Sequence, residues 1–164
     1  MNIRVAGIVN DSIVDGPGFR LAVFTQGCIH DCPGCHNPKT HDFNGGYDMD
    51  TDDILVQAKE NILLDGITLS GGDPFCQSEP CAAIAKGAKE IGLNVWCYTG
   101  YTYEELLDGG PDWLELLKYI DVLVDGRFEI EKKTLSCRFR GSSNQRLIDV
   151  QASLENGAVV LFDA

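Results

Sequence analysis

Three cysteines within eight residues constrain this 164-residue chain more than any other feature. They are Cys28, Cys32 and Cys35, with the spacing C-x3-C-x2-C. Turn-forming residues lie among them: Gly27, Pro33, Gly34 and Pro38. A loop of this kind turns its sulfur atoms toward one point, as a metal site requires. Three thiolates are one short of the usual ligand set of a four-iron cluster, so a cluster held here would keep one iron without a cysteine ligand.

Two other interpretations of the cysteine loop follow from the residues alone. A structural zinc could be held by the three cysteines and one histidine, with His30, His36 and His41 as candidates. A disulfide framework is the other alternative. The total of seven cysteines is odd, and no apolar secretory segment follows Met1, which argues against disulfides. The zinc alternative stays open at this point.

Length and charge limit the function further. A chain of 164 residues can bury a single core, and we expect one domain over 1–164. The chain has no run of eighteen apolar residues, so we expect no membrane span, and reduced thiols without a signal peptide indicate the cytoplasm. The formal charge of -12 repels a polyphosphate backbone, so nucleic acid is not an expected partner.

The order of apolar runs, turns and amphipathic stretches predicts repeated strand and helix units. We expect strands at 3–9, 21–25, 67–70, 94–100 and 120–128. Helices are expected after caps at Asp50 or Thr51 (with apolar positions as far as Leu63), at Ser78 and at Thr102, and over 112–118. The segment 129–146 is expected to be a loop across the open mouth of the sheet. Strands at 147–150 and 158–162 are expected to form a hairpin through Asn156-Gly157.

This pattern is typical of an α/β fold with mostly parallel strands. A closed eight-stranded barrel needs about 200 residues or more, so we expect an incomplete βα barrel that is open on one side. The cysteine loop begins at the C-terminal end of the strand at 21–25. Ligands gather at that edge of parallel sheets because the loops that leave the strands converge there.

Six motifs, taken together, carry a resemblance to a known family. In chain order they are VDGPGFR at 14–20, C-x3-C-x2-C at 28–35, SGGDP at 70–74, YTGY at 98–101, VDGRF at 124–128 and RFRGSSNQR at 138–146. The set resembles the activating enzymes of the anaerobic (class III) ribonucleoside-triphosphate reductase, which are radical S-adenosylmethionine (SAM) enzymes. The cysteine motif is shared by the whole radical SAM superfamily, whereas the GSSNQR stretch is typical of this subgroup. The resemblance covers nearly the whole chain and implies the incomplete barrel of the radical SAM type.

The resemblance also implies cofactors and the residues that hold them. Cys28, Cys32 and Cys35 would bind a 4Fe-4S cluster, and SAM would chelate the open iron. The residues implied around SAM are Gly34, His36, Gly71, Gly72, Asp73, Tyr98, Asp125 and Arg127. Within this set the glycine main chain would pair with the methionyl amino group, because a residue without Cβ allows a close approach.

Three of these SAM contacts have competing explanations. Asp125 and Arg127 would bind the ribose hydroxyls and the carboxylate of SAM, although a surface ion pair with a turn would also explain them. Tyr98 would stack on adenine, although core packing explains it equally well.

The implied activity is the generation of a protein radical. By resemblance, the reduced cluster passes one electron to SAM, and the resulting 5'-deoxyadenosyl radical abstracts hydrogen from a glycine of the reductase. The partners would be that reductase and an external electron donor such as flavodoxin or ferredoxin. The alternatives are an activator of another glycyl-radical enzyme, such as pyruvate formate-lyase, and a non-catalytic zinc or iron-sulfur module.

The four cysteines outside the loop are not expected to bind metal: Cys76, Cys81, Cys97 and Cys137. Cys97 lies in an apolar run and is expected to be a small buried hydrophobe. No cysteine lies between Cys35 and Gly71. That absence argues against relatives which carry an inserted ferredoxin-like segment at this point.

Overall fold

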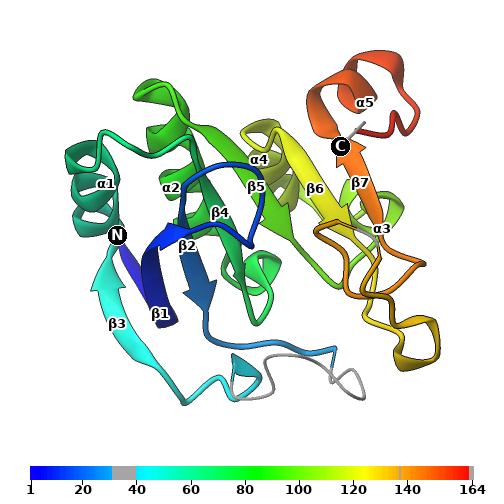
Figure 1. Cartoon of the computed structure of the whole chain (residues 1–164), viewed down its shortest axis with the longest axis horizontal. Coiled ribbons are helices and arrows are strands. Elements are labelled where there is room, and N and C mark those ends of the chain that lie inside the picture. Colours follow the sequence, from blue (N-terminus) through cyan, green and yellow to red (C-terminus); the bar gives the residue numbers. More distant parts are fainter. Residues whose placement is uncertain (31–39, 137, 163–164) are drawn as a thin grey trace.

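The computed structural model describes residues 1–30, 40–136 and 138–162. Within these ranges the chain forms a seven-stranded sheet with the order β3-β1-β2-β4-β5-β6-β7 (Figure 1). The strands are β1 Asn2–Ser12, β2 Arg20–Thr25, β3 Tyr47–Asp50, β4 Gly66–Gly71, β5 Asn94–Tyr98, β6 Val122–Asp125 and β7 Arg146–Asp149. The four strands β2, β4, β5 and β6 are parallel, and β1, β3 and β7 run antiparallel to their neighbours. The fold is therefore a mixed α/β sheet with a parallel centre. The α/β class and the parallel central strands agree with the prediction, whereas the antiparallel pairing of β1 and β7 with the parallel strands was not predicted.

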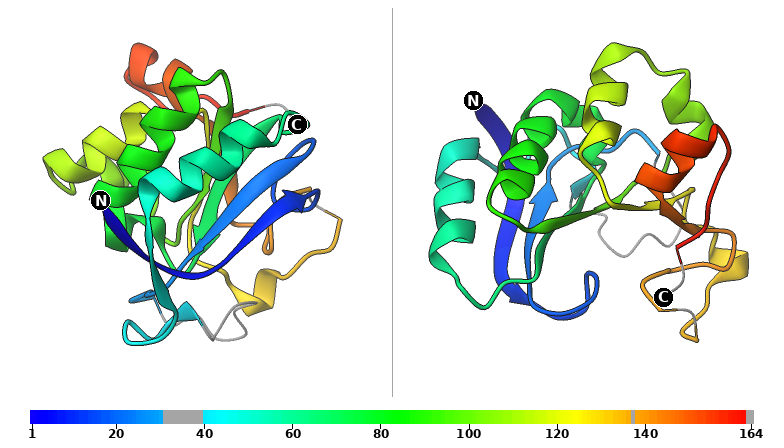
Figure 2. Two further views of the ribbon diagram at one scale, coloured as in Figure 1. Left: turned by 90° about the vertical axis from the view of Figure 1, so that its left-hand side faces the viewer. Right: turned by 90° about the horizontal axis from the view of Figure 1, so that it is seen from above.

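Helices follow β3, β4, β5 and β7, of which only β4 and β5 belong to the parallel centre. They are α1 Thr51–Glu60, α2 Ser78–Glu90, α3 Tyr103–Leu107, α4 Pro111–Lys118 and α5 Val150–Asn156, with short 3-10 turns η2 Pro74–Gln77 and η3 Ile130–Lys132. Figure 2 shows α1, α2 and α4 side by side on one face of the sheet. Two of the predicted caps are confirmed: the Asp50 side chain accepts from the amide of Asp52, and Thr102 forms a reciprocal capping box with Glu105. The predicted cap at Ser78 is wrong, because Ser78 is the first residue of α2 and follows the N-cap Gln77, whose side chain makes no capping bond.

Alternating residues of the central strands face two different environments. Leu69 and Cys97 point into the main core beneath the helices, with Ile84 of α2. Trp96 and Val124 face the other side, where a smaller apolar cluster includes Phe139 and Phe162 at its margin. The helices thus seal one face, while loops cover the other and leave room for a pocket.

The predicted C-terminal hairpin is wrong. Residues after β7 form α5, whose first turn is capped by Asp149 through a bond to the amide of Ala152 (3.1 Å). Gly157 ends the helix in the left-handed conformation, with φ of 68°. Asn-Gly suits a hairpin turn and a helix C-terminus equally well because both need a positive φ. The chain then returns beside β7, where the amide of Phe162 donates to the carbonyl of Leu147 (2.8 Å).

Two further details differ from the sequence prediction. No strand is predicted between those at 21–25 and 67–70, but Tyr47–Asp50 forms β3 at the sheet edge, paired with β1. Edge strands exposed on both faces lack apolar alternation, so β3 gives little sequence signal. Ile62 and Leu63 lie beyond the end of α1 and are 92% and 69% exposed, not on its buried face. Among the described residues, no helix is long and apolar enough to cross a membrane.

Arg20 is fully buried at the start of β2 and joins three parts of the fold. Its guanidinium donates to Thr68 Oγ1 (2.7 Å) on β4 and to Asn94 Oδ1 (2.6 Å) on β5. It also donates to the carbonyl of Pro17 (3.0 Å) in the loop before β2. Burial lowers the pKa of Arg20 to about 10, so the side chain still carries its charge at neutral pH. The guanidinium therefore fastens the motif at 14–20 to the sheet.

Replacing Arg20 with methionine is expected to destabilise the protein by about 2–4 kcal/mol, because several buried acceptors lose their donor at once. Urea unfolding followed by circular dichroism measures the change. The control is Lys59→Met, which removes an exposed cation from α1 and should leave the unfolding midpoint nearly unchanged. Equal midpoints for Arg20→Met and wild type would contradict this role.

Candidate functional site

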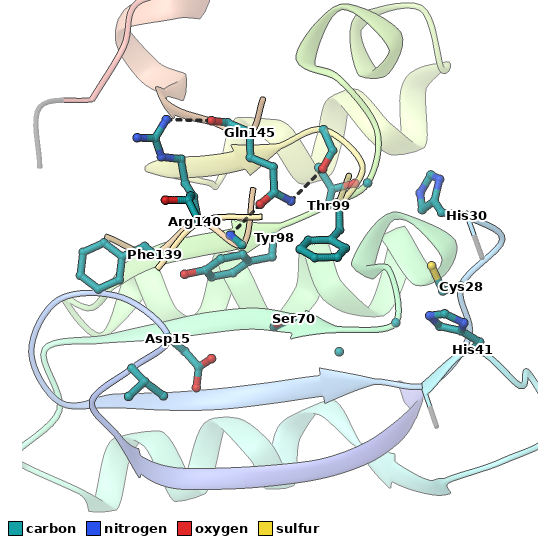
Figure 3. A pocket seen from close by; sticks show the side chains of 18 of the residues that line it. Asp15, Cys28, His30, His41, Ser70, Tyr98, Thr99, Phe139, Arg140 and Gln145 are labelled. Atoms are coloured by element: carbon teal, nitrogen blue, oxygen red, sulfur yellow. Dashed lines mark hydrogen bonds between the residues drawn. The ribbon is translucent and has the colours of Figure 1, made fainter. Parts of the chain in front are cut away.

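A pocket of about 730 Å³ lies at the C-terminal ends of the parallel strands. Its walls come from the ends of β4, β5 and β6, from the loop after β1 and from the segment 126–145. The residues that line it are Val14, Asp15, Cys28, His30, His41, Ser70, Gly71, Gly72, Tyr98, Thr99, Gly100, Gly126, Phe128, Thr134, Leu135, Phe139, Arg140, Gly141 and Gln145. In Figure 3, Cys28, His30 and His41 gather at one end, whereas Asp15 and Phe139 stand at the other. The volume suits a ligand of the size of a nucleoside.

The base of the cysteine loop is closed by main-chain hydrogen bonds. The amide of Gly27 donates to the carbonyl of Thr40 (2.6 Å), and the amide of Cys28 donates to the carbonyl of His41 (3.3 Å). The amide of Asp73 donates to the carbonyl of Gly27 (2.9 Å), which ties this base to the end of β4. Cys28 therefore lies at the pocket. The predicted ligands Cys32 and Cys35, with Gly34 and His36, lie outside the described residues.

Gly71 and Gly72 are glycines because neighbouring main chain leaves no room for a side chain. Gly71 has φ of 97°, and a Cβ there would lie 2.4 Å from the amide nitrogen of Thr25. At Gly72 a Cβ would lie 2.3 Å from the carbonyl oxygen of Gly27 and 2.8 Å from that of Thr40. Gly71 thus allows the end of β4 to lie close to the end of β2, and Gly72 allows the chain after β4 to lie close to the base of the cysteine loop. Both glycines line the pocket. Their main-chain contact with SAM stays a prediction.

Asp73 follows the two glycines, but its carboxylate is turned into the protein. It is fully buried and accepts from His30 Nε2 (2.6 Å), from Thr99 Oγ1 (3.0 Å) and from the amide of Gly100 (2.9 Å). The sequence offered no sign of the pairing with His30, which lies 43 residues away and was considered only as a zinc ligand. A contact between Asp73 and SAM stays a prediction.

Asp125 and Arg127 do not pair with each other through the contacts observed. Asp125 is buried at the end of β6, where Arg146 binds both carboxylate oxygens (3.0 and 2.5 Å) and the amide of Tyr103 donates to one of them (2.8 Å). The hydrogen bonds that Arg146 donates to the carboxylates of Asp125 and Glu104 raise the pKa of Arg146 above its usual value. Arg127 is half exposed and donates through Nε to His30 Nδ1 (3.3 Å). The roles of Asp125 and Arg127 toward SAM stay predictions.

The predicted loop at 129–146 is largely confirmed: the described residues 126–136 and 138–145 form one wall of the pocket, with the 3-10 turn η3 within them, and Arg146 begins β7. Gln145 holds this wall in shape: its Oε1 accepts from the amide of Gly141 (2.8 Å), and its Nε2 donates to the carbonyl of Gly126 (3.0 Å). Arg140 donates to the main-chain carbonyl of Gln145 (3.0 Å) (Figure 3). Hydrogen bonds of Gln145 in the GSSNQR motif and of the preceding Arg140 therefore hold this pocket wall in its conformation. The sequence did not single out Gln145 or Arg140 as pocket residues.

Tyr98 faces Asp15 across the pocket from the end of β5. Burial raises the pKa of the Tyr98 phenol, so this group stays protonated and remains a hydrogen-bond donor at neutral pH. The aromatic ring is only partly buried, which leaves part of it accessible from the pocket. Stacking of Tyr98 on adenine stays a prediction.

The cysteines outside the loop are placed mostly by packing. Cys97 and Cys81 are fully buried in the main core, as expected for Cys97. Cys76 is partly buried. This burial, and to a smaller extent the nearby Asp73 carboxylate, raises the pKa of the Cys76 thiol to about 11. Cys137 lies outside the described residues. Within the described ranges, no three His, Cys, Asp or Glu side chains are grouped as a metal site.

Comparison with known proteins supplies the identity that the geometry leaves open. A sequence model described as a 4Fe-4S single cluster domain matches residues 14–148. The anaerobic ribonucleoside-triphosphate reductase-activating protein of Escherichia coli K12 is 38% identical and covers 81% of this chain and 90% of its own. The proteins of the same name from Vibrio cholerae (37%; 81% and 89%) and Enterobacteria phage T4 (36%; 82% and 86%) are similar to the same extent. The chain belongs to the anaerobic ribonucleoside-triphosphate reductase-activating proteins.

A solved structure supports the fold of this activating-protein chain. The crystal structure of QueE from Escherichia coli superposes with a TM-score of 0.51, at 14% identity, over 62% of this chain and 54% of that one. At this identity the likeness concerns the fold alone. It agrees with the mixed sheet and parallel centre described above.

The residues of this activating-protein chain fit the 4Fe-4S cluster that the family match supplies. Cys28 lines the pocket at the strand ends, and the segment between Cys28 and Thr40, which carries the other two predicted ligands, is closed at its base. Both ring nitrogens of His30 are already engaged, by Asp73 and by Arg127. Since zinc needs a free ring nitrogen, His30 does not fit the zinc alternative.

Proposed function

We propose that this chain generates a glycyl radical on an anaerobic ribonucleoside-triphosphate reductase, with a 4Fe-4S cluster and SAM as its cofactors. The observation that carries the proposal is the alignment with activating proteins of that name over about four-fifths of the chain. The pocket at the strand ends, with Cys28 at one end, provides a site of suitable size and chemistry.

In this proposal the three loop cysteines hold the cluster, and the rest of the pocket holds SAM. When bound, the cluster supplies the single electron that cleaves SAM and so starts hydrogen abstraction from glycine. The main chain of Gly71 and Gly72 offers polar groups to the methionyl end, and Tyr98 offers a ring and a hydroxyl to the nucleoside end. The Arg127 guanidinium is the proposed partner of the SAM carboxylate. We also propose that Gly34, His36, Asp73 and Asp125 lie around SAM.

The pocket is open to a protein substrate in this proposal. We infer that the sheet corresponds to an incomplete barrel of the radical SAM type, whose open side admits a loop of the reductase. Hydrogen abstraction needs the target carbon within about 3–4 Å of the attacking atom, so the partner must insert its own chain. Glycine suits a narrow entry because it has no side chain.

Three further assignments remain proposals. The electron donor would be a flavodoxin or a ferredoxin, residues 1–164 would act as a single domain, and the reaction would take place in the cytoplasm. Neither nucleic acid nor a membrane has a role in this scheme.

The test combines the reconstituted protein with its proposed substrate. Anaerobic reconstitution should give a brown protein with about four irons per chain. With a reductant, SAM and the anaerobic reductase, electron paramagnetic resonance should show a glycyl doublet on the reductase, with a roughly matching yield of 5'-deoxyadenosine.

Two results would favour the alternatives. A doublet that forms only when pyruvate formate-lyase replaces the reductase would point to the other class of activator. A colourless protein that holds one zinc would reject the radical chemistry altogether.

A further inference from the structure

The carboxylate of Asp73 is engaged entirely by groups of the protein in the described structure. It is 0% exposed, and besides His30, Thr99 and Gly100 it accepts from the amide of Phe75 (3.0 Å). A buried carboxylate is costly unless donors surround it, and here donors come from the cysteine loop, from the end of β5 and from η2. Asp73 therefore joins three separate segments at one point.

His30 is enclosed as firmly as its partner. Its side chain is 2% exposed, and its ring meets the ring of Tyr101 edge-on, with 4.4 Å between centroids. A Cβ on Gly100 would lie 2.4 Å from His30 Cδ2, so the missing side chain at Gly100 makes room for the imidazole. The YTGY motif thus packs around the His30 imidazole through Gly100 and Tyr101, a role that the sequence did not suggest.

The hydrogen bonds of His30 select one tautomer. The Arg127 guanidinium has no acceptor, so in the bond between Arg127 Nε and His30 Nδ1 the imidazole must accept. The proton of the neutral ring is then on Nε2, where it is donated to Asp73. Asp73, His30 and Arg127 form one directed chain, which reaches from the end of β4 to the segment after β6.

We propose that Asp73 and His30 act as a positioning pair for both cofactors. His30 lies two residues after Cys28 and two before Cys32, so the bond to Asp73 holds the cysteine loop in place for the cluster. The Nδ1 atom of the same ring orients Arg127, the proposed partner of the SAM carboxylate. This inference rests on the proposed function and adds the residues that couple the cluster loop to the SAM site.

Variants of His30 separate the two halves of the pair. His30→Gln keeps an N–H donor near the position of Nε2 but offers no acceptor at that of Nδ1. It should retain iron at the wild-type level and bind SAM about tenfold more weakly. His30→Phe keeps the ring volume and loses both bonds, so it should also lose about tenfold in iron retention. Asp73→Asn, which removes the charge and one acceptor, should lose iron as His30→Phe does.

The readouts do not depend on turnover. Iron per chain is measured after a timed challenge with a chelator, and the SAM dissociation constant by equilibrium dialysis. The change that SAM causes in the resonance spectrum of the reduced cluster gives an independent view of the same contact. Circular dichroism and thermal unfolding before reconstitution show whether each variant folds, and His30→Gln serves as the milder variant if His30→Phe does not.

Two results would overturn the positioning role. One is wild-type iron retention and SAM affinity in a folded His30→Phe protein. The other is equal iron loss in His30→Gln and His30→Phe, which would show that the bond to Asp73 is not what holds the loop. A failed radical assay on the reductase, with the variant differences intact, would reject the proposed function and leave the positioning pair standing.

Discussion

Replacing Cys28 with alanine is expected to lower SAM cleavage and glycyl-radical formation at least about a hundredfold. The sulfur of Cys28 lies at the pocket end where the cluster is proposed to bind, and alanine offers no ligand in its place. Cys32→Ala and Cys35→Ala should behave alike, since each removes one of three ligands. The measurements are iron per chain after anaerobic reconstitution, 5'-deoxyadenosine yield and the amplitude of the glycyl doublet.

The matched control for Cys28→Ala is Cys76→Ala. Cys76 is also partly buried, and its amide donates to the carbonyl of Asp73 (2.9 Å), whose own amide donates to Gly27 at the base of the cysteine loop. Cys76 belongs to η2, however, and not to the cysteine loop. We expect Cys76→Ala to keep close to the wild-type iron content and activity. If this variant proved as inactive as Cys28→Ala, the assignment of the three ligands would be wrong.

Gly72→Ala is expected to reduce iron retention and SAM cleavage at least about tenfold. A Cβ at this position would lie 2.3 Å from the carbonyl oxygen of Gly27 and 2.8 Å from that of Thr40. Both contacts are with main chain at the base of the cysteine loop, so neither can be relieved by turning a flexible side chain. Overpacking of this kind costs about 1–3 kcal/mol, and here the strain falls on the segment that carries the cluster ligands. The same iron and 5'-deoxyadenosine assays report the effect.

Gly7→Ala is the control for Gly72→Ala. Gly7 lies in β1, and a Cβ there would meet nothing within 4 Å. This variant should keep wild-type iron content, SAM cleavage and thermal stability. Wild-type behaviour of Gly72→Ala itself would show that the cysteine loop does not depend on its close contact with β4.

Local signals in the sequence were enough for most of the helices and strands. The runs at 21–25 and 67–70 are short, apolar and bounded by turn residues, and both form central parallel strands. The caps at Asp50 and Thr102 are confirmed because a cap depends only on residues two or three positions away. The hairpin after β7 failed for the same local reason: Asn156-Gly157 satisfies two structures that both need positive φ, and the Asp149 cap selected the helix.

The tertiary structure was needed for every contact between distant residues. Arg20 carries no sign in the sequence that its partners will be Thr68 and Asn94, because the strands that carry them become neighbours only in the folded sheet. Asp125 illustrates the same limit. Its pairing with Arg146 depends on the antiparallel register of β6 and β7, which places the two residues opposite each other.

What the sequence determined by itself is the chemistry: three cysteines at a fixed spacing after a buried strand, and ordered motifs that lead to the activating-protein family. Ligand spacing and motif order are properties of the amino-acid sequence and do not depend on knowing the fold. Only the tertiary structure decided how the motifs cooperate, with Gly72 against the base of the cysteine loop and Asp73 bound to His30. The physical reason is that burial and hydrogen bonding act over a few ångströms in space, while these partners are tens of residues apart along the chain.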